Sequence, residues 1–426
     1  MNLFRNRLLR ASSHLTLATL FAGGLGYVFQ VLMGRLLCDS EFAAFSSLNS
    51  LTMIVGSPLA ALMMLIARRV ARLNATNNTA VLSWLYRFWQ TRVLGTFLVL
   101  GCILARAMPQ VQAFVKTSDG VAVWLFWGVL AINALVLVNA AFLQGFQRFA
   151  WLGGLSVIIV ALKIGIACGL IVAAEWGLRG ALTSMMCAGF IIWIAGLIHL
   201  QRTFSPQQNQ CGNEASGFPL HEVLSCLSAT VGFAVLSQAD VPLANRVFPP
   251  EIAAPYAAAA VLGKAVLYLP GGIALALFPM VAANEHCARS RTAMLRQALT
   301  TTALACGIVA IVFSTSGDFI IQAAYGHRYP NASGILAMYG WAMVPLALVF
   351  VLKNYFIASA KTAYSFLVGG AAFLLVVLLK YASASPATML TAVGSLSIAL
   401  CVVSLWMHAF HPPSLLTSDH SRYDHA

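Results

Sequence analysis

The stretch VGFAVLSQADVPLANRVF, residues 231–248, is a hydrophobic segment that carries a carboxylate, amides and a proline toward one end. Its first half is apolar enough to lie in lipid, whereas Gln238, Asp240, Pro242 and Asn245 interrupt its second half. A charged side chain at the centre of a membrane-spanning helix costs roughly 2.5–3.5 kcal/mol on insertion scales. Such residues usually face a polar cavity or pair with another group, so this stretch predicts a membrane protein with a functional interior.

The composition of the whole chain supports a polytopic membrane protein. The 426 residues are 60% hydrophobic and only 9% charged, whereas soluble domains carry about 25% charged residues. The net charge of +13 fits basic cytoplasmic loops, or cations that meet an anionic substrate, better than it fits binding to nucleic acid. The nine cysteines form no CxxC motif, so we expect neither a metal site nor a disulfide framework, and no cofactor.

Twelve apolar segments are long enough to cross a bilayer, which takes about 20 residues. Their approximate spans are 13–35, 43–67, 85–106, 121–143, 151–174, 180–200, 222–246, 255–281, 297–315, 334–358, 363–381 and 388–408. The polar connection after the sixth span divides them into two lobes of six helices, 1–200 and 221–410. We expect the linker 201–220 and the tail 411–426 to be cytoplasmic, because more Lys and Arg residues lie on that side of the helices.

Two short stretches hold equivalent places in the two predicted lobes. RLLCDSEFAAF (35–45) and RVFPPEIAAPY (246–256) each follow the first helix of their lobe, so that Arg35 corresponds to Arg246. Because an even number of helices precedes the second lobe, both lobes have the same orientation. This pattern predicts two parallel repeats related by an axis along the membrane normal, a common plan among transporters.

Two lysines lie deep in their predicted helices. Lys163 is close to the middle of the fifth helix, where it either faces a central cavity, pairs with a polar group on a neighbouring helix or is held neutral. Lys264 lies about ten residues, or about 15 Å, inside the eighth helix. Asp240 stands opposite Lys264 across a short turn, so we expect a salt bridge between them.

The periodicity of the seventh helix predicts which of its residues are wet. Ser237 and Asp240 share one face, which we expect to line a cavity, whereas Gln238 points roughly 200° away from Asp240 in a continuous helix. The alternative is a polar helix end that is kinked by Pro242 and has no further role.

Three more basic residues complete the candidate set. Arg35, Arg246 and Arg92 are predicted, with Lys163 and Lys264, to bind substrate. Arg92 follows an aromatic run and alternatively lies at the cytoplasmic interface. For Lys353, near the inner end of its helix, we expect the ammonium to reach the membrane surface.

The run SQADVPLANRVFPPEIAAPYAAAAVLGKAVLYLPGGIALALFPMVA (237–282) resembles the polysaccharide flippases of the multidrug/oligosaccharidyl-lipid/polysaccharide (MOP) exporter superfamily, the Wzx-like polysaccharide transporter group. The N-terminal SEFAAFSSLNSLTMIVGSPLAALMMLIAR is similar to its counterpart there. The likeness covers nearly the whole chain as a helix plan. One departure is the helix number, since several relatives, lipid II flippases among them, have fourteen helices.

The resemblance implies an all-α membrane protein with two six-helix lobes in a MATE-like, V-shaped bundle. It implies a flippase in the bacterial inner membrane that exports an undecaprenyl-pyrophosphate-linked oligosaccharide for O-antigen, lipopolysaccharide or exopolysaccharide synthesis. Polysaccharide polymerases and glycosyltransferases are the implied partners, and a proton or sodium gradient the implied energy source. The matching positions are Lys264, implied to meet the pyrophosphate, and Asp240, implied in ion coupling.

Two other classes of protein stay open. An ion-coupled small-molecule or drug antiporter, of the same superfamily or of the major-facilitator type, would have the same helix plan. A membrane enzyme would need chemistry in an outer loop, for which Asp318, His327 and Arg328 are the only candidates. We expect no enzyme activity.

Overall fold

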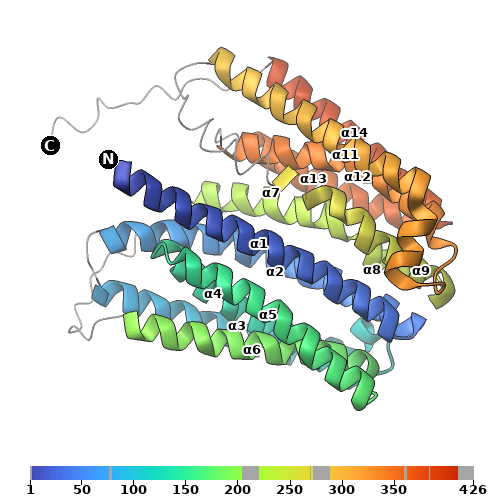
Figure 1. The fold of residues 1–426 in the computed structure, drawn as a ribbon, viewed down its shortest axis with the longest axis horizontal. Helices are drawn as coiled ribbons and strands as arrows, with labels where there is room; N and C mark the ends of the chain where they lie inside the picture. The colour runs from blue at the N-terminus through green and yellow to red at the C-terminus, as the bar shows by residue number, and fades with distance from the viewer. Residues whose placement is uncertain are drawn as a thin grey trace.

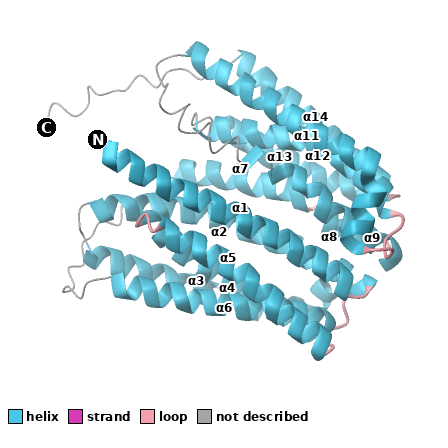
Figure 2. Cartoon of the chain, viewed as in Figure 1, coloured by secondary structure: helices cyan, strands magenta, loops and turns pink. Residues whose placement is uncertain are grey.

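The protein is built from helices throughout the residues that its computed structural model describes, which are 2–75, 79–203, 220–268, 270–271, 288–358, 362–382 and 384–410 (Figures 1 and 2). The N-terminal lobe contains α1 (Asn2–Leu36), α2 (Asp39–Ala75), α3 (Thr79–Val115), α4 (Gly120–Gly145), α5 (Phe149–Cys168), the π turn η1 (Gly169–Ala173) and α6 (Gly177–Thr203). The C-terminal lobe contains α7 (Leu220–Gln238), α8 (Asp240–Val247), α9 (Pro250–Gly263), the 3₁₀ turn η2 (Lys264–Tyr268), α11 (Ala288–Tyr325), α12 (Ala332–Ala358), α13 (Thr362–Tyr381) and α14 (Pro386–Phe410).

The chain is a multi-pass, all-α membrane protein, as its composition predicts. Within the described residues, ten helices are long and apolar enough to cross a membrane, and α7 with α8 makes an eleventh span that is bent by 42°. The predicted span 255–281 begins in α9 and η2, and its remainder lies largely outside the described residues. Most of the predicted linker and all of the predicted tail, 411–426, also lie outside them.

The two lobes repeat one packing scheme. In the N-terminal lobe α1 packs on α5, α2 on α4, and α4 on α3 and α6. In the C-terminal lobe α7 packs on α13, α9 on α12, and α12 on α11 and α14. The two sets of contacts match when α7 with α8 is taken as the counterpart of α1, and α9 as the counterpart of α2. The remaining helices, α11 to α14, then correspond in order to α3 to α6. This match supports the predicted internal repeat. Between the lobes, α2 contacts α7, α8 and α9 (Figure 1).

Several helices extend beyond the membrane length that hydropathy predicts. α2 continues through Arg68, Arg69 and Arg72 to Ala75, and α3 begins at Thr79 rather than near residue 85. No proline or glycine interrupts either extension, so nothing in the sequence ends the helix at the membrane surface. Hydropathy locates the lipid-facing part of a helix, and its ends are set by backbone chemistry.

A buried polar network ties α3, α4 and α6 together. The Tyr86 hydroxyl donates to Asn139 Oδ1 (2.7 Å), and the Asn139 amide donates to the Trp193 carbonyl (2.9 Å). Gln90 donates to the same Asn139 oxygen at 2.8 Å. Gly196 lies against Asn139, where an added Cβ would fall 2.5 Å from the amide nitrogen. In an apolar surrounding such satisfied polar groups fix how the helices pack.

An exposed ion pair joins the start of α4 to α6. Asp119 caps α4 by accepting from Val121 N (3.0 Å) and also accepts two hydrogen bonds from Arg179, the shorter at 2.5 Å. The hydrogen bond from Arg179 lowers the pKa of Asp119 below its ordinary value. Because the folded-state pKa is depressed, the stabilisation is present above the unfolded-state pKa and is lost as the pH falls through the folded-state pKa.

We expect Asp119→Asn to lower the melting temperature slightly at pH 7 and to have no effect at a pH below the folded-state pKa, because the amide keeps the cap but loses the ion pair. Asp119→Ala also removes the cap, which is worth about 1 kcal/mol, and should therefore lower the melting temperature at both pH values. Thermal unfolding of the purified protein at the two pH values measures this. Equal losses for the asparagine variant at both pH values would refute the assignment.

Candidate substrate site between the lobes

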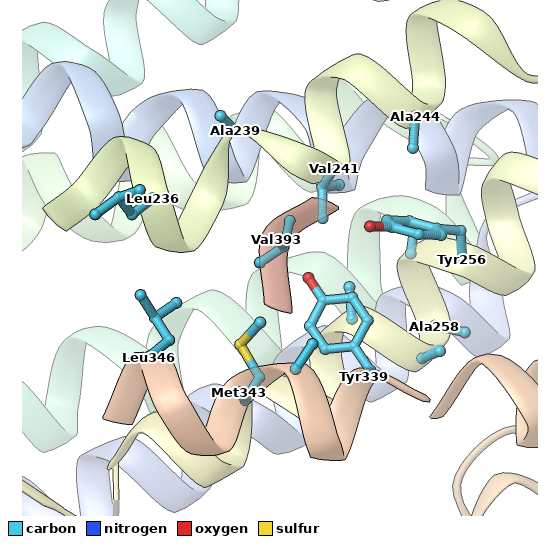
Figure 3. Packing of buried hydrophobic residues seen from close by; sticks show 14 of the residues in the cluster. Leu236, Ala239, Val241, Ala244, Tyr256, Ala258, Tyr339, Met343, Leu346 and Val393 are labelled. Atoms are coloured by element: carbon cyan, nitrogen blue, oxygen red, sulfur yellow. The ribbon is translucent and has the colours of Figure 1, made fainter. Parts of the chain in front are cut away.

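The seventh span is broken at Ala239, between the end of α7 at Gln238 and the start of α8 at Asp240. The cause lies in the sequence, because Pro242 has no N–H to donate to the carbonyl of Gln238, four residues earlier. The two segments meet at 42°. Figure 3 shows Ala239 at this break, with Leu236 on one side and Val241 on the other.

Because the helix is broken here, the side chains of Gln238 and Asp240 both contact Lys264. Lys264 donates to Gln238 Oε1 at 2.8 Å and to Asp240 Oδ1 at 3.2 Å. The expected salt bridge between Asp240 and Lys264 is therefore present. The expectation that Gln238 points away from Asp240 is wrong, since it assumed a continuous helix and the backbone turns between the two residues.

Two tyrosines complete the surroundings of Asp240. The hydroxyl of Tyr256, on α9, donates to Asp240 Oδ2 at 3.0 Å, and the hydroxyl of Tyr339, on α12, donates to the same oxygen. Figure 3 shows both hydroxyl oxygens directed into one space below α8. Asp240 is 2% exposed and both tyrosines are fully buried. The carboxylate thus joins α8, α9, η2 and α12 into one unit.

A small polar cavity of about 40 Å³ lies between the lobes, beside this unit. The N-terminal lobe contributes Tyr27 and Gln30 from α1 and Ser46, Asn49, Ser50 and Met53 from α2. The C-terminal lobe contributes Gln238, Val241, Ala257, Ala260, Val261 and Lys264. We expected Ser237 and Asp240 to line the cavity, and this prediction is wrong. Gln238 lines it instead. Ser237 donates to the Phe233 carbonyl of its own helix (2.9 Å), and Asp240 lies behind Lys264.

Lys264 is the one charged residue among the described residues that line this cavity. An ammonium group has three N–H donors, and Gln238 and Asp240 accept from two of them. The side chain is therefore held by its own lobe with one donor still available to the cavity. This arrangement can bind an oxygen-rich, anionic or polyhydroxylated group.

The other four predicted substrate residues do not line the cavity. Lys163 is half-buried on α5, with no ion pair or hydrogen bond recorded for it within the described residues. Arg92 is exposed on α3, with its guanidinium 5.1 Å from the Phe88 ring centroid. Arg35 and Arg246 lie at one end of the bundle, where both contact the opposite lobe.

At the end of the bundle opposite the N-terminus, an arginine of each lobe donates hydrogen bonds to the C-terminal carbonyls of a helix in the other lobe. Arg35, at the end of α1, donates to the carbonyls of Ala323 and Ala324 at the end of α11. Arg328, just after α11, donates to the carbonyls of Gly34 and Arg35 at 3.1 Å. Cations suit helix C-termini because the last carbonyls have no partner within the helix.

An ion pair and a close backbone approach reinforce this exchange. Arg328 pairs with Asp39, at the start of α2, at 3.0 Å. The Tyr329 hydroxyl donates to the Gly34 carbonyl at 3.1 Å, and a Cβ on Gly34 would fall 2.5 Å from the ring of Tyr325. We call the contacts of Arg35, Arg328 and Tyr329 with Asp39 and the two helix ends the inter-lobe latch.

Further contacts across the lobes lie at the same end. Lys116 donates to the Phe248 carbonyl (2.9 Å), and Asn245 donates to the Val115 carbonyl (2.8 Å). The guanidinium of Arg246 lies 5.3 Å from the ring centroid of Phe114. Together with the latch, these contacts join the two lobes at this end of the bundle.

One further expectation is corrected by the contacts of Lys353. Lys353 does not reach the membrane surface: it is buried, with its ammonium 4.7 Å and 4.9 Å from the ring centroids of Phe233 and Phe350, because two aromatic faces attract a cation inside the lobe. The three residues considered for an enzyme do not converge, since Asp318 is exposed on α11, His327 contacts Gln322, and Arg328 belongs to the latch.

Sequence reasoning missed the two tyrosines that hold Asp240 and the serines of α2. Tyr256 ends the repeated stretch 246–256 and Tyr339 lies in an apolar run, and neither position carries a pattern that marks it as a partner of Asp240. The sequence does indicate the α2 wall, because Ser46, Asn49, Ser50 and Met53 are spaced so that they lie on one face of a helix.

The two lobes, the broken span and the cavity between them define a fold class, that of two-lobed, MATE-like helix bundles. The sequence itself matches no family model and no curated protein. The fold is similar to that of the lipid II flippase MurJ in an inward closed conformation, with a TM-score of 0.63 and 16% identity over 93% of this chain and 87% of that one.

Two MATE structures are similar to the same degree. A multidrug resistance MATE family transporter of the MOP superfamily, in an inward-facing conformation, gives a TM-score of 0.62 with 12% identity, covering 90% of this chain and 93% of that one. The eukaryotic MATE transporter AtDTX14 gives a TM-score of 0.62 with 13% identity, covering 94% of this chain and 96% of that one. At such identities the likeness concerns the fold, and the named proteins are transporters and a flippase.

Proposed function

We propose that this protein is a flippase of the bacterial inner membrane that moves a polyprenyl-pyrophosphate-linked oligosaccharide from the inner to the outer leaflet for surface polysaccharide synthesis. The observation that carries the proposal is the position of Lys264, a buried ammonium that lines a polar cavity between two lobes and keeps one donor available to it. A charged headgroup cannot cross the hydrocarbon bare, and a fixed cation with polar neighbours lowers that barrier.

The geometry supports transport by rocking of the two lobes about this cavity. The latch and its neighbouring contacts close one end, and breaking them would let the lobes separate there. The polyprenyl chain would remain in the bilayer while the headgroup passes between α1 and α2 on one side and α7, α8 and α9 on the other. Alternating access around a midplane site is the usual plan for carriers built from repeats.

Asp240 is proposed as the residue that couples transport to a proton or sodium ion. Its carboxylate accepts from Lys264, Tyr256 and Tyr339, so a cation or proton that binds there must displace one of these donors and thereby alter the position of Lys264. Lys163, Arg35, Arg246 and Arg92 stay predicted substrate contacts, which the headgroup would meet outside the cavity described above.

The second candidate is an ion-coupled small-molecule or drug antiporter, favoured by the likeness to the multidrug MATE transporter. A cationic drug calls for a carboxylate at the cavity wall. Among the described lining residues the charged group is a lysine, and Asp240 lies behind it. This arrangement favours the anionic, oxygen-rich substrate.

The test is a comparison of cells with and without the protein. We expect that its removal causes lipid-linked oligosaccharide to accumulate on the cytoplasmic face of the inner membrane, and that surface polysaccharide is lost. Restoration by the wild-type chain is the control. If lipid-linked oligosaccharide does not accumulate but cationic dyes do, the antiporter is the correct assignment.

A further inference from the structure

The N-terminal wall of the cavity is polar but carries no charge. Ser46, Asn49 and Ser50 lie on one face of α2, at the spacing i, i+3, i+4, and Gln30 adds a second amide from α1. Hydroxyl and amide groups both donate and accept hydrogen bonds. The only charged lining group in the described residues, Lys264, belongs to the C-terminal lobe. The N-terminal wall therefore suits an uncharged part of a ligand that is rich in hydroxyl groups.

The hydroxyl of Ser46 is an unpartnered polar group in this wall. Ser46 is 6% exposed, and its Oγ finds no hydrogen-bond partner within the described part of the protein. Buried polar groups are almost always hydrogen-bonded, so such an exception calls for an explanation. Ser46 lines the cavity, where a bound ligand would supply the missing partner.

The opposite wall provides small apolar side chains. Val241, Ala257 and Ala260 line the cavity on the C-terminal lobe. A sugar ring has hydroxyl groups at its edge and C–H groups on its faces, so it needs hydrogen-bonding groups on one side and a flat apolar surface on the other. Ligand sites generally combine apolar walls with a few polar groups that fix orientation.

We propose that the wall formed by Ser46, Asn49, Ser50 and Gln30 binds the hydroxyl groups of the sugar next to the phosphate, while Lys264 and Gln238 hold the phosphate side. This inference rests on the proposed function and adds to it that the cavity recognises the glycan as well as the charge. The protein then selects a glycosylated lipid over the same lipid without a sugar.

The matched pair Ser46 and Ser47 tests this. Both hydroxyls are buried without a recorded partner, but Ser46 lines the cavity and Ser47 does not. Replacing a buried, unpartnered hydroxyl by hydrogen does not expose a new unsatisfied group, so both alanine variants should fold. The probes are undecaprenyl pyrophosphate and undecaprenyl-pyrophosphoryl-N-acetylglucosamine, and the measurement is the equilibrium binding of each to the purified full-length protein.

We expect the wild type to bind the glycosylated lipid about tenfold or more tightly than the bare one, as several neutral hydrogen bonds allow. Ser46→Ala should lower the affinity for the glycosylated lipid by about three- to tenfold and should leave the affinity for the bare lipid unchanged. Ser47→Ala should change neither of these two affinities. Equal wild-type affinities for the two lipids, or equal losses for both serine variants, would overturn the inference and leave the proposed function standing. If the wild type binds neither lipid, both this inference and the proposed function are wrong.

Discussion

Replacing Lys264 with methionine is expected to reduce export of the lipid-linked oligosaccharide by about 10- to 100-fold. The reason is the loss of a charge-assisted hydrogen bond to the headgroup, which is worth about 1.5–3 kcal/mol. Accumulation of the lipid-linked precursor on the cytoplasmic face measures the effect. Lys353→Met is the matched control, because Lys353 is as buried as Lys264, each being 8% exposed, but lies between two aromatic rings and away from the cavity.

Lys264→Met should also destabilise the protein, and a double variant tests this effect on stability by itself. Removing one partner of a buried ion pair costs roughly 3–5 kcal/mol, because the other charge stays buried without compensation. Asp240→Asn with Lys264→Met leaves no charge, so this double variant should regain most of the thermal stability that Lys264→Met loses. It should still fail to export. Wild-type export by the stable double variant would show that Lys264 acts only as the partner of Asp240.

Replacing Arg328 with alanine is expected to open the closed end of the bundle. The substitution removes the ion pair with Asp39 and two hydrogen bonds to carbonyls at the end of α1. If one charged hydrogen bond contributes about 1.5–3 kcal/mol to closure, the ratio of open to closed forms rises about 10- to 100-fold. A cysteine at Asn49, in a chain otherwise free of cysteine, should then react faster with a membrane-impermeant maleimide added on the latch side.

Arg179→Ala is the control for the latch. Arg179 also pairs with an aspartate, Asp119, but that ion pair joins α4 and α6 within one lobe. Its removal should leave the labelling of the cavity cysteine unchanged. If Arg328→Ala and Arg179→Ala have the same effect on labelling, the contacts of Arg328 do not govern closure.

The helices and the central ion pair could be predicted from the sequence, because hydropathy and a carboxylate opposite a lysine are local signals. The bend could not be placed in the same way, although Pro242 marks it, since a helical wheel assumes an unbroken backbone. That assumption put Gln238 and Asp240 on different faces, whereas the break lets both reach Lys264.

The partners of Asp240 and the latch depend on residues far apart in the chain. Tyr339 is 99 positions from Asp240, and Arg328 is 289 positions from Asp39. A tyrosine in an apolar run and an arginine in a loop have no pattern that shows which helix end they will meet. Arg35 is a predicted substrate residue, and its contacts here are with the backbone carbonyls at the end of α11.

We propose that the protein moves a pyrophosphate-linked glycan across the bilayer by way of the cavity beside Lys264. The most direct measurement reconstitutes the purified protein into liposomes that carry undecaprenyl-pyrophosphate-linked oligosaccharide in the inner leaflet and follows its appearance at the outer surface with a lectin. We expect transfer by the wild type and transfer slowed about 10- to 100-fold with Lys264→Met. Transfer by the wild type no faster than in protein-free liposomes, with an ion gradient of protons or of sodium imposed, would contradict it.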